Sequence, residues 1–402
     1  MIKVALLGFG VVGSGCAEVL TQNKDLIKGK VGDDLEIKYI LDLRDFPDSP
    51  FAQRVVHDFN VIVNDPEVAI VAEMMGGSHP AYEFTKACLE AGKSVVTSNK
   101  EVVANFGTEL LALAEKHGVS YLFEASVGGG IPVLRSIYVD LASNRISEVN
   151  GILNGTTNYI LTSMKQSGAS FGDALKKAQE LGYAEANPAA DVEGLDAARK
   201  TAILCGLCFG KLVSPADIHT EGITAITGED VAAAAELGYA IKLIGHADTK
   251  EGKIQALVSP RLVPLCNPLS GISDVFNGVL LKGDMVGEVM FYGPGAGKLP
   301  TASAVVGDII DVAHGVVGGT VKRPYFENAT AEDVADFGDY ACARYFRFAN
   351  TPDEVTEALG EQVQQIVTKS GYVAVITKAM SERKAVASVA DKLCVLSCMR
   401  VL

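Results

Sequence analysis

The chain has 402 residues, of which 48% are hydrophobic and 21% are charged, and its formal net charge is −14. This length corresponds to two or three domains of roughly 100–200 residues each. The acidic balance argues against a nucleic-acid or membrane-surface partner, because both kinds of partner bind basic surfaces. No apolar run approaches the ~20 residues of a membrane span, and the first residues lack a signal-peptide pattern.

Eight cysteines are scattered along the chain, and no His or Cys pattern has the spacing of a zinc site. Cys205 and Cys208 form a C-x-x-C pair inside an apolar helical run, so we interpret them as buried small hydrophobic residues. This cysteine usage predicts a cytoplasmic protein.

Strand and helix patterns alternate through the first third of the chain, which predicts an α/β fold with a Rossmann-type parallel sheet and crossover helices. The predicted strands are Ile2–Leu7, Leu35–Leu41, residues 69–74, Ser94–Thr97 and residues 119–123, and the predicted helices are residues 13–20, 81–91 and 108–116. We therefore expect a dinucleotide-binding domain over residues 1–130.

The pattern changes after residue 131, where we expect an α+β catalytic and dimerisation domain up to residue 300. A further helix at residues 301–314 follows a glycine-rich turn and should complete the first domain as part of residues 300–320. The predicted helices are Phe171–Glu180 and residues 194–209 and 230–244, the predicted strands are residues 254–258 and 277–281, and residues 316–339 are predicted to form a connection.

A glycine-rich motif, Gly8-Phe9-Gly10-Val11-Val12-Gly13, follows the first predicted strand and opens a helix, which is the context that dinucleotide binding requires. Its first glycine makes the tight turn, the second lets the backbone approach a pyrophosphate, and the third packs helix on strand. The N–H groups at the start of the helix attract the phosphates. Asp42 suits the ribose of NAD, whereas Arg44 suits the 2′-phosphate of NADP, so the sequence leaves this preference open.

The most informative stretch is residues 182–200, which read G-Y-A-E-A-N-P-A-A-D-V-E-G-L-D-A-A-R-K. Asp196 and Lys200 are four residues apart and share one face of a helix. Glu185 and Asp191 precede that helix. Taken alone, the stretch also fits a solvated helix start with an i,i+4 ion pair.

Together with four other segments, this stretch resembles the homoserine dehydrogenase family. The segments follow the family's order over about residues 1–320, and they are residues 97–100 (T-S-N-K), 124–132 (E-A-S-V-G-G-G-I-P), 151–159 (G-I-L-N-G-T-T-N-Y) and 295–297 (G-A-G). The resemblance implies reversible, NAD(P)-dependent hydride transfer between L-homoserine and L-aspartate 4-semialdehyde, in threonine, methionine and isoleucine biosynthesis. It also implies a homodimer or homotetramer.

The resemblance also implies residue roles. Lys200 is the general acid/base, and Lys100 assists proton transfer at the nicotinamide end of the cofactor. Because an ordinary lysine pKa is about 10.4, a base at Lys200 needs desolvation and a second cation to lower it, while Asp196 acts in the opposite direction. The implied ligands of the substrate's ammonium group are Glu185 and Asp196, with Asp191 as a further acid, and the implied cofactor contacts are Gly8, Phe9, Gly10, Val11, Val12, Gly13, Gly76, Ser98, Lys100, Gly182 and Gly297.

A sodium ion is implied by the resemblance at the segment that begins with Glu124. Its ligands would be Glu124, Val127, Gly129 and Ile131, and oxygen ligands are those that hard cations prefer. The alternative is a plain strand-end turn with glycines at positive φ.

Two other functions compete with this one. A dehydrogenase that oxidises the semialdehyde needs an activated cysteine nucleophile with a nearby base, and no cysteine lies in a polar, glycine-rich turn. A non-catalytic nucleotide sensor would have no need for Lys100 and Lys200 together with the acids.

Residues 340–402 are predicted to form a βαββαβ unit, which is a ferredoxin-like order and resembles the ACT regulatory domain. In such domains an Asp-x-Pro-Gly type turn after the first strand exposes backbone amides to an amino-acid effector. The corresponding turn here is Asn350-Thr351-Pro352-Asp353, with Asp353 in place of the glycine. We therefore expect the unit to support assembly and threonine to be a poor inhibitor.

Overall fold

The computed structural model describes residues 1–318, 323–390 and 392–402 and contains two compact units. The first unit comprises Met1–Arg145, Gly206–Ser214 and Gly293–Asn328, and the second comprises Ile146–Cys205, Pro215–Tyr292 and Ala329–Leu402. Residues 319–322 belong to the predicted connection and to the predicted end of the dinucleotide-binding domain, and they lie outside the described residues.

The first unit is built on a six-stranded sheet in the order β3-β2-β1-β4-β5-β6, and every pair of neighbouring strands is parallel. This is the strand order of a dinucleotide-binding fold, and it confirms the predicted parallel sheet. The strands are β1 Ile2–Leu7, β2 Leu35–Leu41, β3 Val55–Val56, β4 Val68–Glu73, β5 Ser94–Thr97 and β6 Tyr121–Leu122.

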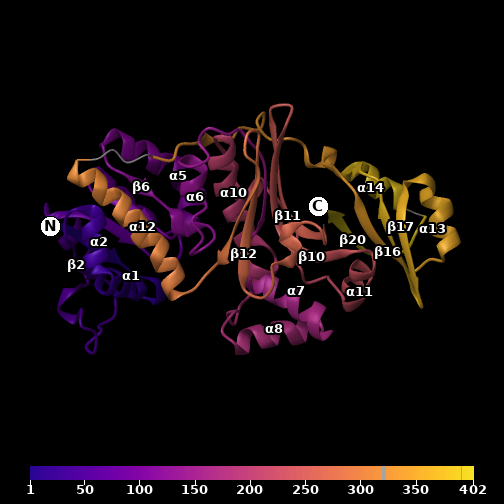
Figure 1. Cartoon of the computed structure of the whole chain (residues 1–402), viewed down its shortest axis with the longest axis horizontal. Helices are drawn as coiled ribbons and strands as arrows, with labels where there is room; N and C mark the ends of the chain where they lie inside the picture. Colours follow the sequence, from indigo (N-terminus) through magenta and orange to yellow (C-terminus); the bar gives the residue numbers. More distant parts are fainter. Residues whose placement is uncertain (319–322, 391) are drawn as a thin grey trace. The chain divides into compact units, whose positions relative to one another are not determined.

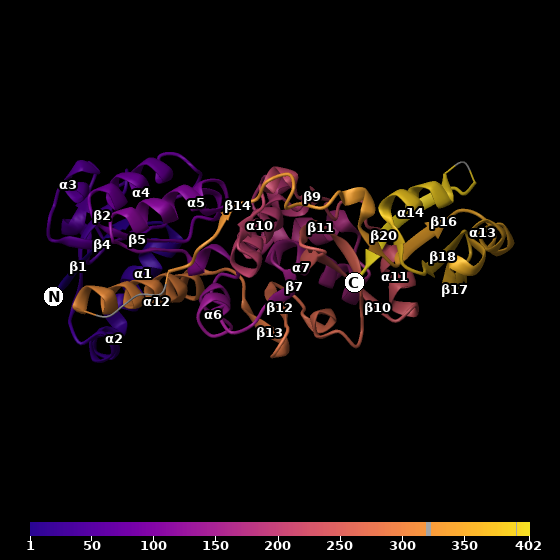
Figure 2. The same ribbon diagram turned by 90° about the horizontal axis from the view of Figure 1, so that it is seen from above.

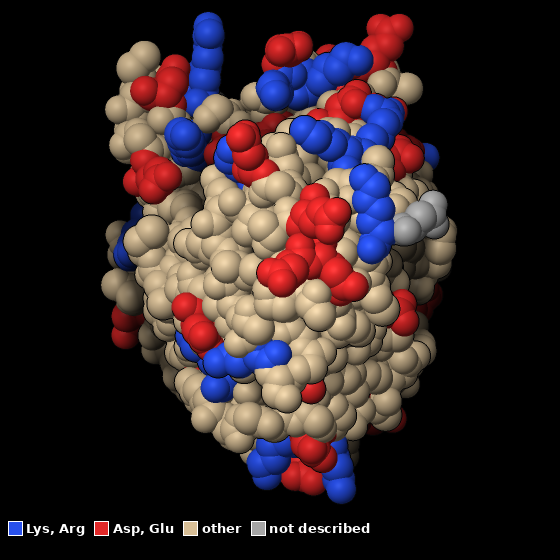
Figure 3. Space-filling view, turned by 90° about the vertical axis from the view of Figure 1, so that its right-hand side faces the viewer, with Lys and Arg blue, Asp and Glu red and all other residues tan. Residues whose placement is uncertain are grey.

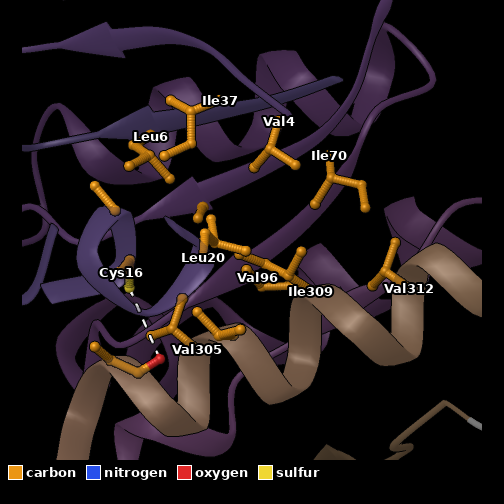
Figure 4. Close-up of a cluster of buried hydrophobic side chains, with 14 of the residues drawn as sticks. Val4, Leu6, Cys16, Leu20, Ile37, Ile70, Val96, Val305, Ile309 and Val312 are labelled. Atoms are coloured by element: carbon orange, nitrogen blue, oxygen red, sulfur yellow. Dashed lines mark hydrogen bonds between the residues drawn. The ribbon is translucent and has the colours of Figure 1, made fainter. Parts of the chain in front are cut away.

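The helices of this unit cover the sheet and bury an apolar core. Figure 4 shows α12 presenting Val305, Ile309 and Val312 to strand residues such as Val4 and Ile70, all of which are buried. The helix α12 therefore packs on the first sheet. The helices are α1 Val11–Gln22, α2 Lys24–Val31, α3 Asn60–Val63, α4 Ala81–Glu90, α5 Lys100–Lys116, α6 Leu134–Tyr138 and α12 Lys298–Val317.

Helix α5 begins eight residues before the start predicted for it. The side chain of Asn99 accepts hydrogen bonds from the backbone N–H groups of Glu101 and Val102, which satisfies donors that a helix start leaves open. The predicted helix 108–116 was therefore too short, and Lys100 stands in the first turn of α5.

The second unit contains a larger sheet in the order β13-β12-β7-β10-β11-β20-β16-β18-β17, with β9 paired to β11 (Figures 1 and 2). Its helices are α7 Gly155–Ser167, α8 Phe171–Glu180, α9 Ala189–Val192, α10 Leu195–Phe209 and α11 Gly228–Glu236, with α10 ending in the first unit. Its strands before the C-terminal segment are β7 Ile146–Ile152, β9 His219–Thr220, β10 Tyr239–Lys250, β11 Lys253–Pro264, β12 Phe276–Gly283 and β13 Gly287–Pro294.

The predicted helix over residues 230–244 is wrong in its second half. Helix α11 ends before Gly238, whose φ of +88° breaks the helix, and the chain continues as the long strand β10. Residues 240–247 are buried on both faces of the sheet, so their nearly continuous apolar run shows no alternation and periodicity cannot separate strand from helix. Strands β11 and β12 are longer than predicted, and β7 and β13 were not predicted.

The C-terminal segment follows the predicted βαββαβ order. Its elements are β16 Arg344–Phe348, α13 Pro352–Leu359, β17 Val363–Lys369, β18 Tyr372–Thr377, α14 Glu382–Val389 and β20 Val395–Val401. The strand order β20-β16-β18-β17 is that of a ferredoxin-like fold. Its outer strand β20 also pairs in parallel with β11, so this segment continues the second sheet.

Short strands complete the two units. Strands β8 Lys211–Leu212 and β14 Glu327–Asn328 pair in the first unit, and β15 Ala341–Cys342 and β19 Met380–Ser381 pair in the second. Acidic and basic side chains are interspersed over the face shown in Figure 3. Within the described ranges, no helix is long and apolar enough to cross a membrane.

Candidate functional site

The glycine motif forms the turn between β1 and α1, and its geometry admits only glycine at two positions. Gly8 has a φ of +90°, and a Cβ placed on Gly13 would lie 2.1 Å from the carbonyl oxygen of Gly8. The motif lines a cavity of about 540 Å³. This cavity brings together the predicted cofactor residues Gly8, Gly10 and Gly76, and its other lining residues are Leu41, Asp42, Leu43, Arg44, His57, Phe59, Met74, Met75, Pro80 and Phe84.

Asp42 and Arg44 both line this cavity, and they bind each other. The guanidinium Nε and Nη2 of Arg44 donate to the two carboxylate oxygens of Asp42, each at 3.0 Å. The backbone N–H of Phe9 donates to the same carboxylate at 2.8 Å. These bonds, with those from Arg44 strongest, hold the pKa of Asp42 well below its usual range. The cavity therefore presents a fixed, ionised carboxylate next to the glycine turn.

A buried acid, Glu73, connects the wall of this cavity to the start of α5. Its carboxylate accepts hydrogen bonds from the Thr97 hydroxyl at 2.5 Å and from the Met75 N–H at 2.7 Å. The Asn99 amide donates to the Gly77 carbonyl at 2.7 Å, and burial raises the pKa of Glu73 to about 7. Glu73 and Asn99 are absent from the predicted site residues. The signal that could have identified Glu73 is an acid at the carboxyl end of an otherwise apolar strand.

The predicted catalytic residue Lys200 and two predicted substrate ligands, Asp191 and Asp196, lie in one cluster of the second unit. Lys200 Nζ donates to Asp196 Oδ2 and to the carbonyl of Leu153, each at 2.7 Å. Asn154 Nδ2 donates to Asp191 at 2.7 Å and to Asp196 at 2.9 Å. The structure therefore brings Lys200, Asp191 and Asp196 together, as the motif requires, and Asn154 is a member that was not predicted.

Asn154 has this position because it follows β7 by two residues and caps α7. Its side-chain oxygen accepts the N–H of Thr157 at 2.9 Å, while its side-chain N–H₂ group faces the acids. An amide is suited to such a place because it offers both an acceptor and two donors. The residue stands in the G-I-L-N-G-T-T-N-Y segment, so its motif was visible although its role was not.

Two predicted residues of this stretch lie apart from the cluster. Glu185 is exposed, and the hydrogen bonds joining Lys200, Asp191 and Asp196 do not include its carboxylate. Gly182 ends α8 with a φ of +76°, but a Cβ there would meet no atom within 4 Å. Gly297, with a φ of +125°, caps α12 in the first unit.

Glu124 is buried beneath the start of α6. Its carboxylate oxygens accept the backbone N–H groups of Leu134 at 2.9 Å and Arg135 at 2.6 Å, and its own N–H donates to Asp308 at 2.8 Å. Desolvation raises the pKa of Glu124 to about 7, and burial together with Glu124 raises that of Asp308 well above its usual range.

The glycines after Glu124 form a tight turn. Gly128 and Gly129 have φ values of +74° and +55°, and a Cβ on Gly129 would lie 2.3 Å from the carbonyl oxygen of Gly295. In the described part of the chain, no three His, Cys, Asp or Glu side chains gather as they would for a metal held by side chains. A cation at this turn would therefore depend mainly on backbone carbonyls.

Three buried cysteines are unsuited to serve as the activated nucleophile that aldehyde oxidation needs. Burial raises the pKa of Cys16, Cys88 and Cys205 to about 12, so these thiols stay protonated. Cys205 is buried as predicted, whereas Cys208 is half-buried.

Known protein families match almost the whole of the first 310 residues. Residues 8–124 match a model described as homoserine dehydrogenase, NAD binding domain, and residues 132–310 match homoserine dehydrogenase. The homoserine dehydrogenase of Bacillus subtilis is 44% identical over 336 residues, which are 81% of this chain and 77% of that one.

Solved structures match in fold as well. A homoserine dehydrogenase from Thiobacillus denitrificans has a TM-score of 0.91 at 36% identity and covers 100% of this chain and 98% of its own. A hyperthermophilic archaeal homoserine dehydrogenase in complex with NADPH has a TM-score of 0.68 at 26% identity, covering 80% of this chain and 99% of its own.

The raised pKa of Glu124 predicts a pH dependence of stability. The pKa rises from 4.5 to about 7 on folding, so folded Glu124 keeps its proton in a range where the unfolded chain has lost it. Its contribution to the unfolding free energy is complete below pH 4.5 and is lost as pH rises through 7, by up to about 3 kcal/mol. In Glu124→Gln the fall in unfolding free energy between pH 5 and pH 8, measured by urea denaturation, should be smaller. Glu90→Gln, at an exposed carboxylate of α4, should keep the original fall. An unchanged fall in Glu124→Gln would contradict the assignment.

Proposed function

The chain belongs to the homoserine dehydrogenase family of NAD(P)-dependent oxidoreductases, and from this premise we propose that Lys200 carries the proton in the interconversion of L-homoserine and L-aspartate 4-semialdehyde. The observation that supports this role is the buried cluster in which a lysine ammonium is held by one carboxylate and one backbone carbonyl. That carboxylate, Asp196, is linked through the Asn154 amide to one further acid, Asp191.

In the oxidising direction Lys200 accepts the proton of the homoserine hydroxyl, and in the reducing direction it returns it. When bound, the nicotinamide cofactor supplies the hydride acceptor or donor. The carbonyl of Leu153 and the carboxylate of Asp196 fix the direction of the Lys200 ammonium, so the proton moves along a set line. Lys100, at the first turn of α5, assists proton transfer from the cofactor side.

Asp191 and Asp196 hold the ammonium group of the amino-acid substrate. Both already accept hydrogen bonds from one Asn154 amide group, which sets the spacing between their carboxylates. A cation between two such acids gains charge-assisted hydrogen bonds. Glu185, exposed in the loop before α9, is the third acid of this set and reaches the substrate from the loop.

The cofactor contacts are the glycine motif (residues 8–13), Gly76, Ser98, Lys100, Gly182 and Gly297. The turn at Gly8 and Gly13 fits a pyrophosphate, because it leaves no room for a Cβ and presents the N-terminus of α1. We assign NAD as the preferred cofactor and NADP as the weaker one. The ionised carboxylate of Asp42 suits a ribose hydroxyl and repels a 2′-phosphate, and Arg44 is engaged by Asp42.

A monovalent cation, sodium by the family resemblance, is assigned to the turn after Glu124. The carbonyls of Val127, Gly129 and Ile131 would coordinate it, and Glu124 would supply the balancing charge from below. Because the cation favours ionised Glu124, sodium chloride should raise the melting temperature above that in choline chloride more at pH 8 than at pH 6. This difference should vanish in Glu124→Gln. If both salts change the melting temperature of the unaltered protein equally, the assignment of sodium to this site is contradicted.

The C-terminal ferredoxin-like segment resembles an ACT domain, and we assign it to assembly within a homodimer or homotetramer. The polar groups of its turn, which an effector would have to bind, are engaged within the protein. The backbone N–H groups of Thr351 and Glu354 are satisfied by a capping box, and the side chain of Asn350 accepts the Cys394 N–H at 2.7 Å. Threonine is accordingly expected to inhibit poorly.

Eight free cysteines fit a cytoplasmic location. We retain residues 1–130 with 300–320, 131–300 and 340–402 as the three functional domains.

The proton role of Lys200 is tested by Lys200→Met, which keeps the apolar stem and removes the titrating group. We expect kcat for homoserine oxidation to fall by about 10²–10⁴-fold, because general acid–base catalysis contributes this much. The dissociation constant for the cofactor should change little. Lys177→Met, at an exposed lysine of α8, serves as the matched control. A variant at Lys200 that keeps more than about a tenth of kcat would contradict the role.

The cofactor preference is tested by Asp42→Asn. Removing the negative charge frees Arg44 and lifts the repulsion of a 2′-phosphate, so the ratio of kcat/KM for NADP to that for NAD should rise by about tenfold or more, equivalent to ~1.4 kcal/mol. Steady-state kinetics with each cofactor at saturating homoserine measure the ratio. Asp45→Asn, at an exposed acid three residues on, should leave it unchanged. No change in Asp42→Asn would mean that Asp42 does not set the preference.

A further inference from the structure

The C-terminal strand brings an arginine into the interior of the second unit. Strand β20 lies between β11 and β16 in both views (Figures 1 and 2), with Arg400 opposite Arg261 of β11. Arg400 is 4% exposed and needs partners for its charge. Its guanidinium donates to the two carboxylate oxygens of Glu221 at 2.7 and 2.9 Å, and to Glu382 of α14 at 2.7 and 3.2 Å.

Glu221 belongs to the catalytic part of the unit and continues the short strand β9. Its backbone N–H donates to the Val258 carbonyl at 2.8 Å, and its carboxylate also contacts His219 Nε2 at 2.6 Å. Burial would raise the pKa of Glu221, but the hydrogen bonds from His219 and Arg400 outweigh it and lower the pKa to about 2. Glu221 is therefore ionised at any working pH, and the pair with Arg400 persists.

The residues after Glu221 pack directly on the loop that precedes α10. The Ile223 N–H donates to the Val192 carbonyl at 2.9 Å, and a Cβ on Gly222 would lie 2.3 Å from that same oxygen. On the other side, a Cβ on Gly194 would lie 3.1 Å from Thr220. Backbone meets backbone here, so a displacement of the segment at Glu221 must move residues 192–194 as well.

This loop separates the two acids that we assign to the substrate ammonium. Asp191 immediately precedes Val192, and Asp196 lies two residues after Gly194. Gly194 has a φ of +85°, and its carbonyl accepts the first hydrogen bond of α10, from Ala198 at 2.9 Å. The position of the loop therefore sets both the distance between the acids and the start of the helix that carries Lys200.

We propose that Arg400 is a positioning residue for the substrate site: through Glu221 it holds the loop at residues 192–194, and thereby the spacing of Asp191 and Asp196. The inference rests on the proposed roles of those two acids. The C-terminal segment is then a structural part of the substrate site. A displacement of β20 would weaken homoserine binding, because the Arg400–Glu221 pair would transmit it to the loop. A misplacement of well under 1 Å matters in such a site, because oriented charges lose their effect steeply with geometry.

The structure offers a matched ion pair that lacks this connection. Arg347 of β16 binds Asp230 of α11 at 2.8 Å, and both side chains are buried. This pair also links the C-terminal segment to the rest of the unit, but the segment that Asp230 anchors carries none of the proposed substrate or catalytic residues. Loss of either pair should destabilise the unit, and only loss of the first should disturb the loop.

The experiment measures KM for homoserine, the cofactor dissociation constant and the melting temperature in Arg400→Met, Glu221→Gln and Arg347→Met. We expect the first two variants to raise KM by about tenfold, equivalent to ~1.4 kcal/mol, while the cofactor dissociation constant stays within about twofold. Arg347→Met should lower the melting temperature without changing KM. The double variant at Arg400 and Glu221 should raise KM no further than Arg400→Met does, because Arg400→Met already removes the pair with Glu221.

Arg400→Lys keeps the charge but loses the bidentate geometry, and it provides a folded variant if Arg400→Met is too unstable. It should raise KM by an intermediate factor. Unchanged KM in Arg400→Lys and Glu221→Gln, or an equal rise in Arg347→Met, would overturn the proposal. Asp196→Asn separates the two levels: if it leaves KM unchanged, the substrate roles themselves fail, and if it raises KM while the Arg400 variants do not, only the positioning role fails.

Discussion

A buried ammonium group is the constraint around which the second unit is arranged. Lys200 is 9% exposed, and a charge at such depth is tolerated only when acceptors surround it. Asp196 and the Leu153 carbonyl meet this need, which joins α10 to the end of β7. Asp196 and Asp191 both accept hydrogen bonds from the Asn154 amide, which caps α7. The need to balance the buried charge therefore holds the starts of α7 and α10 and the helix α9 together.

The first unit differs, because three of its buried acids are held mainly by neutral donors. Glu73 and Glu124 are held by hydroxyl, amide and backbone N–H donors, and Asp308 accepts the N–H of Glu124. Neutral donors stabilise a carboxylate less than an ion pair does, so burial dominates and the pKa values of the two glutamates rise to about 7. Glu73 ends β4 and Glu124 follows β6, so both lie at the edge of the parallel sheet where folds of this kind bind their ligands.

The C-terminal segment is joined to the second sheet by more than a linker. Strand β20 pairs with β11, and two ion pairs cross the same junction: Arg400–Glu221, in which Glu221 is half-buried, and the buried pair Arg347–Asp230. Backbone pairing supplies a regular connection, whereas the ion pairs favour one register, because a shifted strand would leave the buried charges without partners. The ferredoxin-like segment is in this way a continuation of the sheet of the second unit.

Local chemistry determined much of this protein from the sequence alone. The glycine motif, five of the six strands of the first sheet, the βαββαβ order and the four-residue spacing of Asp196 and Lys200 are properties of short segments, which carry their own periodicity and turn preferences. The short strand β3, Val55–Val56, was not predicted. Only the tertiary structure decided the features that join distant segments. β10 is a strand because of its partner strands and not because of its own sequence pattern. The hydrogen bonds of Asn154 with Asp191, of Thr97 with Glu73, and of Arg400 with Glu221, 179 residues earlier, also arise only in the folded chain. A buried charge pairs with the group that lies next to it in the folded chain, and a short stretch of sequence does not show which distant residue that will be.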